Sequence, residues 1–559
     1  MAQEQTQDRM YRAEIVEVPT RPFPDQRPGT SGLRKKTRVF MQPHYLENFV
    51  QAVLDVAAAG AKAGLARETL VVGGDGRYFN REAIQRIVRM AAANGFGTVL
   101  VARSGLLSTP AMSAVIRARG AQGGLVLSAS HNPGGPDADF GVKFNVRNGG
   151  PAPEAVTEEI YRVASSLARY RTIESPDIDL DREAEHALGA ARVVVFDPIA
   201  DYAALMESLF DFEALRRLFR GDLRMRFDAM NGITGPYAHE ILERRLGAPA
   251  GTVARGTPLE DFGGVHPDPN LVHAAELVRL MDGDGAPDLG AACDGDGDRN
   301  MILGPRLLVS PGDSLAMIAE HAQASIPGYR VGLAGVARSM PTSTAVDRVA
   351  AALRIPCYET PTGWKFFGDL LDAGLCTICG EESFGTGSSH IREKDGLWAV
   401  LCWLSILARS GSSVAEVARA HWRRFGRSYF RRHDYEALDP AAAEGLVGHL
   451  RDRLAGLAGA SLAGSTVASA DDFAYRDPVT GAEALHGGLR IRLADGSRIV
   501  ARLSGTGTEG ATLRLYLERY RDDGGSGEVG AVLAPLRDAA VRLLEIRARC
   551  GRDEPTVIT

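Results

Sequence analysis

Strand-like and helix-like runs alternate along most of this sequence, and this alternation limits the folds open to the chain. In the first series, apolar runs at residues 68–74, 98–102 and 124–127 have the length and composition of buried strands. Between them, residues 81–94 and 111–119 carry apolar side chains at helical spacing. This β-α-β-α-β order predicts a mainly parallel sheet covered by helices.

The same alternation recurs twice further along the chain. One series begins with a strand at residue 223 and the other with a strand near residue 329. Each continues with a helix and a second strand, at 237–246 and 288–293 in the first case and at 342–352 and 375–379 in the second. A chain of 559 residues is too long for one core, so the pattern predicts three similar α/β domains with mixed, mainly parallel sheets.

The pattern changes after about residue 430. An alanine- and leucine-rich helix is expected at residues 440–457, and two strands are expected within 487–503. Asp495-Gly496 between these strands is a strong hairpin signal. We therefore predict a fourth, C-terminal domain of the α+β class. The predicted domains span residues 1–203, 204–320, 321–430 and 431–559.

Charge and hydropathy argue against several classes of partner. Lys and Arg total 64 and Asp and Glu total 70, a formal net charge of −6, so nothing suggests a nucleic acid partner. The polar N-terminus does not resemble a secretory signal. The longest apolar stretch, residues 397–408, is shorter than the ~20 residues that span a bilayer. We expect this stretch to be a buried core helix and expect no membrane partner.

The six cysteines are too few for a disulfide framework and fit a reducing, cytoplasmic setting. Cys376 and Cys379 have Cys-x-x-Cys spacing, but a structural zinc site needs about four ligands and no second pair is present. A redox motif would instead open a helix. The apolar flanks of the pair favour a buried strand.

Ser130 and His131 stand where a buried strand opens into a loop. The strand that ends at Leu127 is followed by Ser, Asn, Pro and Gly residues, which favour turns. Open α/β sheets bind ligands beyond the carboxyl ends of their strands, so the Ser130 hydroxyl is a candidate for chemistry. By itself, the Ser-His pair is also typical of an ordinary turn.

Asp294, Asp296 and Asp298 alternate with glycines in a short loop between two apolar runs. Three carboxylates at this spacing can bind one hard cation, and oxygen ligands suit Mg²⁺ or Ca²⁺. An EF-hand is excluded, because its sixth position would be Arg and its twelfth Pro. An acidic surface turn is the alternative. A phosphoryl group on Ser130 would supply a further oxygen ligand.

Two later loops combine charged and hydroxyl side chains. Residues 502–508 (RLSGTGT) supply an arginine, hydroxyls and glycine amides that suit phosphate, although a glycine-rich turn without ligand also fits. Residues 380–385 (GEESFG) suit sugar hydroxyls, although two acids in a turn usually face solvent. Lys143 and the charge run 392–395 would by default reach solvent. A desolvated lysine can instead transfer protons.

Taken together and in this order, the four loops resemble those of the α-D-phosphohexomutase superfamily, and longer motifs resemble its glucose-specific phosphoglucomutases. These motifs lie at residues 28–35 (PGTSGLRK), 72–78 (VGGDGRY), 130–136 (SHNPGGP), 258–264 (PLEDFGG), 361–368 (PTGWKFFG), 390–396 (HIREKDG) and 555–559 (PTVIT). The resemblance spans essentially the whole chain. It implies four domains around a central active-site cleft and the interconversion of glucose 1-phosphate and glucose 6-phosphate through a phosphoserine.

The resemblance also implies roles for individual residues. The implied catalytic residues are the phosphoserine Ser130, with Arg34 and Arg299 beside it, and Lys143, Lys394 and His131 as candidates for general acid and base. The implied metal ligands are the phosphoryl oxygen on Ser130 with Asp294, Asp296 and Asp298. The implied substrate-binding residues are Thr362, Gly363, Glu381 and Ser383 for the sugar, and Arg502, Ser504 and Thr506 for the phosphate that is not transferred.

The resemblance further implies one Mg²⁺ per chain, glucose 1,6-bisphosphate as intermediate and activator, a sugar phosphate substrate, and a cytoplasmic monomer or homodimer. A glucose 1,6-bisphosphate synthase and a non-catalytic structural relative are the alternatives. A non-catalytic relative should have lost a metal aspartate or changed a sugar- or phosphate-binding loop, whereas this chain retains the three aspartates and both loops. Ala138 stands where the family usually has glycine, and Ser389 where it usually has aspartate. Neither position carries an implied catalytic role, so the two departures bear only on loop rigidity.

Overall fold

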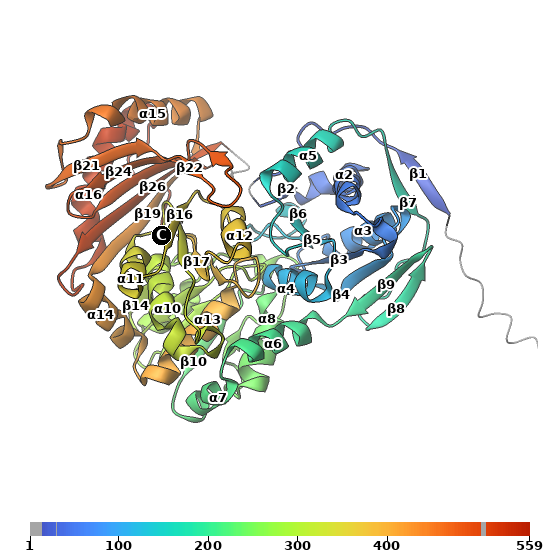
Figure 1. The fold of residues 1–559 in the computed structure, drawn as a ribbon, viewed down its shortest axis with the longest axis horizontal. Helices are drawn as coiled ribbons and strands as arrows, with labels where there is room; N and C mark the ends of the chain where they lie inside the picture. The colour runs from blue at the N-terminus through green and yellow to red at the C-terminus, as the bar shows by residue number, and fades with distance from the viewer. Residues whose placement is uncertain (1–13, 30, 505–509) are drawn as a thin grey trace, which may run out of the picture.

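The computed structural model describes residues 14–29, 31–504 and 510–559. Its helices and strands form four successive domains, which run from blue to red in Figure 1. The first and fourth domains form the two upper lobes in that view, and the second and third domains lie below and join them. The predicted class, three α/β domains followed by an α+β domain, is confirmed.

The first domain contains a seven-stranded sheet in the order β2-β6-β5-β3-β4-β9-β8, whose β3, β4, β5 and β9 are mutually parallel. Its strands are β2 (Leu33–Lys36), β3 (Thr69–Gly74), β4 (Thr98–Leu106), β5 (Gly123–Leu127), β6 (Asp139–Val146), β8 (Ala184–Leu188) and β9 (Ala191–Phe196). Its helices are α1 (Thr37–Phe40), α2 (Tyr45–Gly60), α3 (Asn80–Ala93), α4 (Thr109–Arg119) and α5 (Glu154–Ala164). A separate pair joins β1 (Ile15–Pro19) to β7 (Arg169–Ile173). The strands and helices predicted between residues 68 and 127 are all present.

The second domain has a five-stranded sheet in the order β11-β10-β12-β13-β14. These strands are β10 (Met225–Asp228), β11 (Val253–Ala254), β12 (Leu289–Ala292), β13 (Met301–Gly304) and β14 (Leu307–Val309). Its helices are α6 (Pro198–Leu209), α7 (Phe212–Arg220), α8 (Thr234–Ala238) and α9 (Ala275–Asp282). The helix predicted at 237–246 begins earlier, as α8, and continues as a π-helical turn at His239–Arg245.

The third domain has a four-stranded sheet in the order β16-β15-β17-β18. Its elements are α10 (Pro311–Ser325), β15 (Val336–Ser339), α11 (Ala345–Leu353), β16 (Cys357–Thr360), α12 (Lys365–Asp372), β17 (Ile378–Gly380), β18 (Thr386–Ser388), α13 (Gly396–Ser410) and α14 (Val414–Phe425). The strand predicted to start near residue 329 was placed too early, because Tyr329 closes a 3₁₀ turn and Val331 is 98% exposed. Cys379 lies on β17 with Cys376 just before it, and both are buried as expected.

Helix α13 contains the apolar stretch 397–408, and its residues from Gly396 to Leu407 are buried, which confirms a core helix. No single helix in the described part of the chain has both the length and the apolarity to cross a membrane. Helices α13 and α14 meet that test only as a pair bent by 84°.

The fourth domain is built on a seven-stranded antiparallel sheet in the order β20-β21-β24-β25-β26-β19-β27. Its strands are β19 (Arg427–Leu438), β20 (Ser461–Leu462), β21 (Ser465–Asp472), β24 (Leu489–Leu493), β25 (Arg498–Ser504), β26 (Ala511–Arg521) and β27 (Val557–Ile558), with a small separate hairpin of β22 (Tyr475–Arg476) and β23 (Glu483–Ala484). Its helices are α15 (Pro440–Arg453), α16 (Val529–Leu544) and α17 (Ile546–Cys550). The predicted hairpin at Asp495-Gly496 joins β24 to β25, and Gly496 has the positive φ of 82° that such a turn favours.

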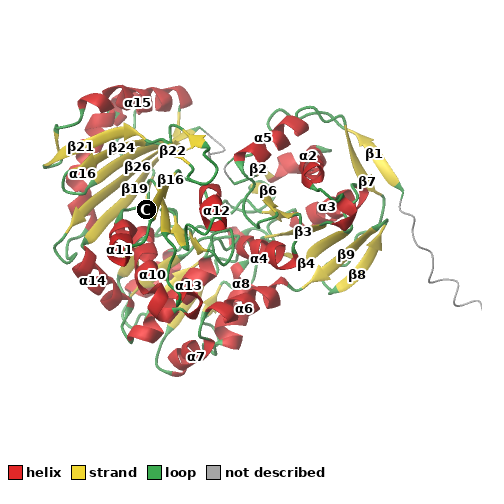
Figure 2. Ribbon diagram, viewed as in Figure 1, coloured by secondary structure: helices red, strands yellow, loops and turns green. Residues whose placement is uncertain are grey.

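The packing of the cores explains how the domains are held together. One continuous apolar cluster joins the first three domains, and includes Val71, Phe227 and Val336. The fourth domain has a core of its own, in which helices α15 and α16 pack on the sheet (Figure 2). The domain boundaries given above stay predictions; α6, α10 and β19 run across them.

Candidate active site

A cavity of about 320 Å³ lies where the four domains meet. Each domain contributes one of the predicted loops to its lining, represented by Ser130, Asp298, Glu381 and Arg502. Segments almost 400 residues apart in the sequence therefore share one cleft.

Ser130 lies just beyond the carboxyl end of β5 and is only 2% exposed. Its φ of 53° is in the left-handed region, which costs a non-glycine residue roughly 1–2 kcal/mol. The backbone is held there because Arg77 donates to the Ser130 carbonyl oxygen at 2.8 Å and the Ser130 N–H donates to Ser128 Oγ at 2.7 Å. In this conformation Ser130 Oγ donates to Asp294 Oδ2 at 2.9 Å.

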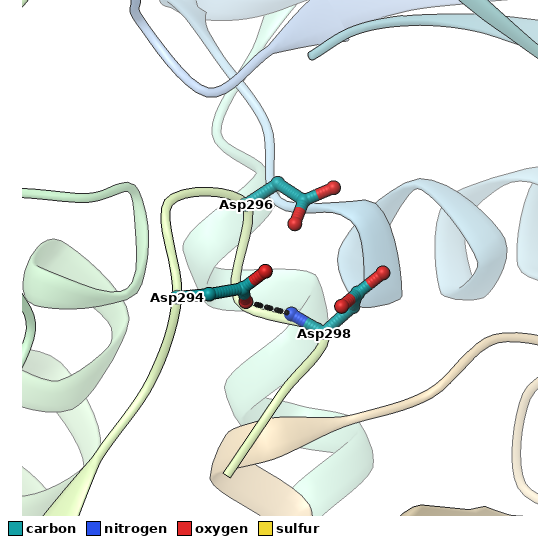
Figure 3. A group of neighbouring side chains, drawn as sticks. All are labelled: Asp294, Asp296 and Asp298. Carbon is teal, nitrogen blue, oxygen red and sulfur yellow. Dashed lines mark hydrogen bonds between the residues drawn. The ribbon is translucent and has the colours of Figure 1, made fainter. Parts of the chain in front are cut away.

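The three aspartates of the second domain lie in a compact loop, residues 294–298, which we call the metal loop because their carboxylate oxygens lie close enough together for one ion. Figure 3 shows their side chains gathered around a common space, with one ligand oxygen from each lying within 4.8 Å of the others. Asp294 Oδ1 accepts the backbone N–H groups of Asp298 and Arg299, at 3.0 Å each, which closes the loop. Asp296 Oδ1 and Asp298 Oδ1 are buried and have no hydrogen-bond partner among the described residues. Such a set of oxygens fits Mg²⁺, which needs anionic oxygen ligands.

Burial and mutual repulsion disfavour the simultaneous ionisation of the three carboxyl groups in the metal loop. Burial, reinforced by Asp298 and Asp296, raises the pKa of Asp294 well above its usual range. Burial acts on Asp296 in the same direction, but the Lys143 ammonium outweighs it and lowers the pKa of Asp296. A divalent cation would relieve this repulsion by offsetting two of the three negative charges.

The two predicted acid–base lysines both reach the metal loop, one from the first domain and one from the third. Lys143, on β6, lies 2.5 Å from Asp296 Oδ2, and Lys394, in the loop before α13, lies 3.1 Å from Asp298 Oδ2. Burial acts to lower the pKa of Lys394, but the carboxylates of Asp298 and Glu381 outweigh burial and raise it. Lys394 is therefore a charged donor at neutral pH.

Arg34, Arg299 and His131 line the cleft around Ser130, as expected. Arg299 donates to Asp268 at 2.8 Å, while the buried Arg34 Nε has no partner among the described residues. His131 Nδ1 lies 3.5 Å from Ser130 Oγ. Burial, then Arg299 and Arg34, lower the pKa of His131 well below its usual value, so this imidazole is neutral at pH 7.

The predicted sugar-binding residues lie together on the third domain. Glu381, directly after β17, accepts the Gly363 N–H at 3.0 Å, and Thr362, Gly363 and Ser383 line the same wall of the cleft. The buried Thr362 Oγ1 has no partner among the described residues. Burial raises the pKa of Glu381. These groups offer both donors and acceptors to a polyhydroxyl ligand.

The predicted phosphate-binding residues lie at the end of β25. Arg502 and Ser504 line the cleft, and Arg502 is oriented by a 3.0 Å bond from its Nε to the Gly487 carbonyl. Thr506 lies outside the described residues. The two departures from the family pattern lie in hydrogen-bonded backbone, since the Ala138 carbonyl accepts from Thr37 N–H and the Ser389 N–H donates to Thr377, each at 2.9 Å.

Three further cleft residues were missed from the sequence. Arg514 on β26 pairs in register with Arg502 and lines the cleft, and its buried Nε has no hydrogen-bond partner among the described residues. Asn145 and Glu393 also line it. The alternation of Lys143 and Asn145 along one strand could have indicated Asn145, since both point to one face. No local signal indicates Arg514 or Glu393.

Comparisons with known proteins agree with this architecture. Models of the phosphoglucomutase/phosphomannomutase alpha/beta/alpha domains I, II and III match residues 25–171, 200–306 and 311–425, and a model of the phosphoglucomutase-1 C-terminal domain matches residues 427–556.

Similar relatives and a similar solved structure cover the chain from end to end. The phosphoglucomutase of Rhizobium radiobacter is 56% identical over 98% of this chain and 100% of its own length. Phosphoglucomutase-1 of Oryctolagus cuniculus is 49% identical, over 98% of this chain and all of its own. The open-form crystal structure of pp63/parafusin, a phosphoglucomutase from Paramecium, superposes with a TM-score of 0.90 at 45% identity, covering 98% of this chain and 99% of that one. The chain therefore belongs to the phosphoglucomutase/phosphomannomutase family.

Proposed function

We propose that this chain interconverts glucose 1-phosphate and glucose 6-phosphate and that Ser130 carries the transferred phosphoryl group. The observation that carries this proposal is the 2.9 Å bond from Ser130 Oγ to Asp294 Oδ2, which joins a buried nucleophile to the metal loop inside the shared cleft. Relatives called phosphoglucomutase, 49–56% identical over nearly the full chain, support the same reaction.

One Mg²⁺ per chain would be held by Asp294, Asp296 and Asp298 together with an oxygen of the phosphoryl group on Ser130. The unpartnered oxygens of Asp296 and Asp298 support this assignment. Bound there, Mg²⁺ supplies Lewis-acid stabilisation of the charge on the transferring group.

In the first transfer, the O–P bond to Ser130 Oγ breaks as an O–P bond forms to a sugar hydroxyl oxygen. The sugar hydroxyl loses its proton to a base, and Ser130 Oγ gains one from an acid. Lys394 and Lys143 are the candidates for these roles, with the neutral His131 close to Oγ. The product, glucose 1,6-bisphosphate, turns over in the cleft and returns its other phosphoryl group to Ser130 by the reverse chemistry.

The cleft must accept the sugar in two orientations, so its binding groups must recognise what both orientations share. The phosphate that is not transferred would be bound by Arg502, Ser504 and Thr506, with Arg514 beside Arg502. Charge-assisted bonds from paired guanidinium groups suit a phosphate dianion. Glu381, Ser383, Thr362 and Gly363 would hold the sugar hydroxyls, and Arg34 and Arg299 would stabilise the phosphoryl group at Ser130.

A coupled assay for glucose 6-phosphate formed from glucose 1-phosphate tests the reaction. Rapid turnover is expected with Mg²⁺ and a catalytic trace of glucose 1,6-bisphosphate, and Ser130→Ala should abolish both the turnover and a phosphate mass on the Ser130 peptide. Stoichiometric consumption of another phosphoryl donor would indicate a bisphosphate synthase instead. Absence of turnover with Mg²⁺ present would refute the proposal and leave a structural relative.

We also infer that the chain works in the cytoplasm as a monomer or homodimer, without nucleic acid or membrane partners. The net charge of −6, the free cysteines and the existence of cytoplasmic relatives in Pisum sativum and, as a probable enzyme, in Arabidopsis thaliana support this inference. Light scattering of the purified protein and fractionation of its native cells test it.

A further inference from the structure

One hydrogen bond crosses from the first to the third domain inside the cleft. Asn145 Nδ2 donates to Glu393 Oε1 at 2.9 Å, although the two residues are 248 positions apart. The same amide nitrogen donates to the Gly149 carbonyl at 3.0 Å. Both amide hydrogens of the fully buried Asn145 are thereby engaged, so its orientation is fixed.

This bond joins the two segments that carry the acid–base lysines. Asn145 follows Lys143 by two positions on β6, so both side chains point to the same face of the sheet. Glu393 immediately precedes Lys394. Lys143 contacts Asp296 at 2.5 Å and Lys394 contacts Asp298 at 3.1 Å. Together with the bond between Asn145 and Glu393, these contacts form a closed circuit that includes the metal loop.

The other side of Lys394 is also fixed. Asp395 caps helix α13 by accepting the Trp398 N–H at 3.0 Å, and it accepts the Tyr202 hydroxyl at 2.6 Å. Lys394 therefore stands between one residue tied to the helix and one residue, Glu393, tied to the first domain. The backbone N–H of Arg392 also binds the first domain, by donating to Ser113 Oγ at 2.9 Å, and Asp298 Oδ2 lies within 4 Å of both lysines. Among the described residues, the bond of Glu393 to Asn145 is the direct side-chain link between the two segments that carry the lysines.

The burial of the Glu393 carboxyl group in the lining of the cleft is energetically unfavourable. Glu393 is 3% exposed, and burial raises the pKa of its carboxyl to about 8, although Lys143 acts in the opposite direction. Among the described residues its one hydrogen-bond partner is Asn145. Burying a carboxyl group with so little compensation costs stability, and its removal would in turn leave a buried amide hydrogen of Asn145 without this partner.

We propose that Glu393 is a positioning residue, which holds Lys143 and Lys394 at a fixed separation across the metal loop by its bond to Asn145. The inference rests on the proposed roles of the two lysines. A mutase that accepts the sugar in both orientations needs its acid and base in one geometry for two transfers. A displacement of about 1 Å can cost a reaction 100-fold.

The test measures kcat and KM in the coupled assay for Glu393→Ala, Asn145→Ala and the double variant. We expect kcat to fall about 10- to 100-fold in each single variant, with KM changed less than threefold. The double variant should be no slower than either single one, because both remove the same bond. Glu393→Gln keeps an oxygen that accepts from Asn145, and should restore kcat to within a few-fold of wild type.

The chain offers a matched control. Asn148 donates to Asp372 at 2.7 Å, which is also a bond between the first and third domains but lies on the exposed surface. Asn148→Ala should leave kcat within twofold of wild type. Asp372 is left unchanged, because its carboxylate also accepts from Arg392 Nε, next to Glu393, at 2.6 Å. Thermal unfolding identifies any variant that does not fold, and Asn145→Ala and Glu393→Gln remain informative if Glu393→Ala fails.

Three outcomes would overturn the proposal. One is a kcat within twofold of wild type for both alanine variants. Another is an equal loss in the Asn148→Ala control, which would indicate general loosening of the interface. The third is a slow Glu393→Gln variant, which would assign the carboxyl a chemical role. Wild type without turnover would instead refute the proposed function, so the two failures are distinct.

Discussion

Lys143 and Lys394 come from different domains, yet both form ion pairs with the same metal loop, Lys143 with Asp296 and more distantly with Asp298, and Lys394 with Asp298. The ammonium groups lie 2.5 Å from Asp296 and 3.1 Å from Asp298. The metal loop of the second domain is thus bound by the first domain through Lys143 and by the third domain through Lys394. The charge at the loop and the placement of the acid–base groups therefore depend on the packing of all three domains.

Removal of one carboxylate from the metal loop should weaken metal binding and catalysis together. Asp296→Asn removes the negative charge of a carboxylate whose Oδ1 has no hydrogen-bond partner among the described residues, and we expect kcat to fall about 100-fold or more. Calorimetric titration with Mg²⁺ should show weaker binding, and EDTA should reproduce the loss in wild type. Asp284→Asn is the control, since the Asp284 side chain is fully exposed. Equal loss in both variants would contradict a specific role.

The shape of the metal loop should depend on Gly297. This residue has φ of 81°, and a Cβ atom there would lie 2.8 Å from Thr234 Oγ1. Gly297→Ala should lower Mg²⁺ affinity and destabilise the fold by about 1–3 kcal/mol, measured by calorimetry and urea unfolding. Gly285→Ala separates the two causes, because Gly285 has a similar φ of 73° but open space around it. A similar loss of Mg²⁺ affinity in that variant would exclude the steric explanation.

Arg514 should contribute to substrate binding even though it lies outside the recognisable phosphate loop. Arg514→Ala removes one guanidinium group next to Arg502, and a lost charge-assisted bond of about 1.5–3 kcal/mol predicts a rise in KM of roughly 10- to 100-fold. Steady-state kinetics with glucose 1-phosphate measure this. Arg521→Ala, at the half-exposed end of the same strand, should leave KM unchanged. An unchanged KM in Arg514→Ala would remove this residue from the site.

The joint between the third and fourth domains should weaken in acid. Glu359 on β16 accepts from Arg338 at 2.9 Å and from Arg490 at 2.5 Å. Burial acts to raise the pKa of Glu359, but these arginines outweigh burial and lower it to about 2. Because the folded pKa lies below the unfolded value near 4.5, the stabilisation is fully present above pH 4.5 and is lost as the pH falls toward 2.

This shift corresponds to about 3 kcal/mol at pH 7. Glu359→Gln should therefore lower the free energy of unfolding in urea by about that amount at pH 7 and by much less near pH 2. Glu82→Gln, on an exposed face of α3, is the control and should change little. A difference between wild type and Glu359→Gln that stays constant from pH 7 to pH 2 would contradict the assigned cause.

The sequence by itself determined much of this protein. Hydrophobic periodicity identified the α/β units, since a strand or helix reveals its buried face through local spacing. Loop chemistry predicted candidate sites at Ser130 and at Asp294, Asp296 and Asp298, because these residues lie within a few positions of strand ends, and the combined motifs strengthened both predictions. The family predicted from the combined motifs is confirmed by matches over nearly the full chain.

Local patterns failed where the environment of a segment depends on distant neighbours. The strand expected near residue 329 starts at Val336, and the apolar Val331 is almost fully exposed. Hydropathy reports what a side chain prefers, whereas burial depends on what the rest of the chain packs against it. The same limit explains why the π-helical turn after α8 was not foreseen.

Only the tertiary structure decided which loops face one another. Arg514 lines the cleft because β26 pairs with β25. Glu393 accepts a hydrogen bond from Asn145 because the loop before α13 packs against the first domain. Pairing and domain packing bring together residues hundreds of positions apart, and no local spacing encodes those distances. The alternation of strands and helices thus predicted the α/β domains of this protein. The long-range contacts that bring the two lysines to the metal loop form only when the domains pack against one another.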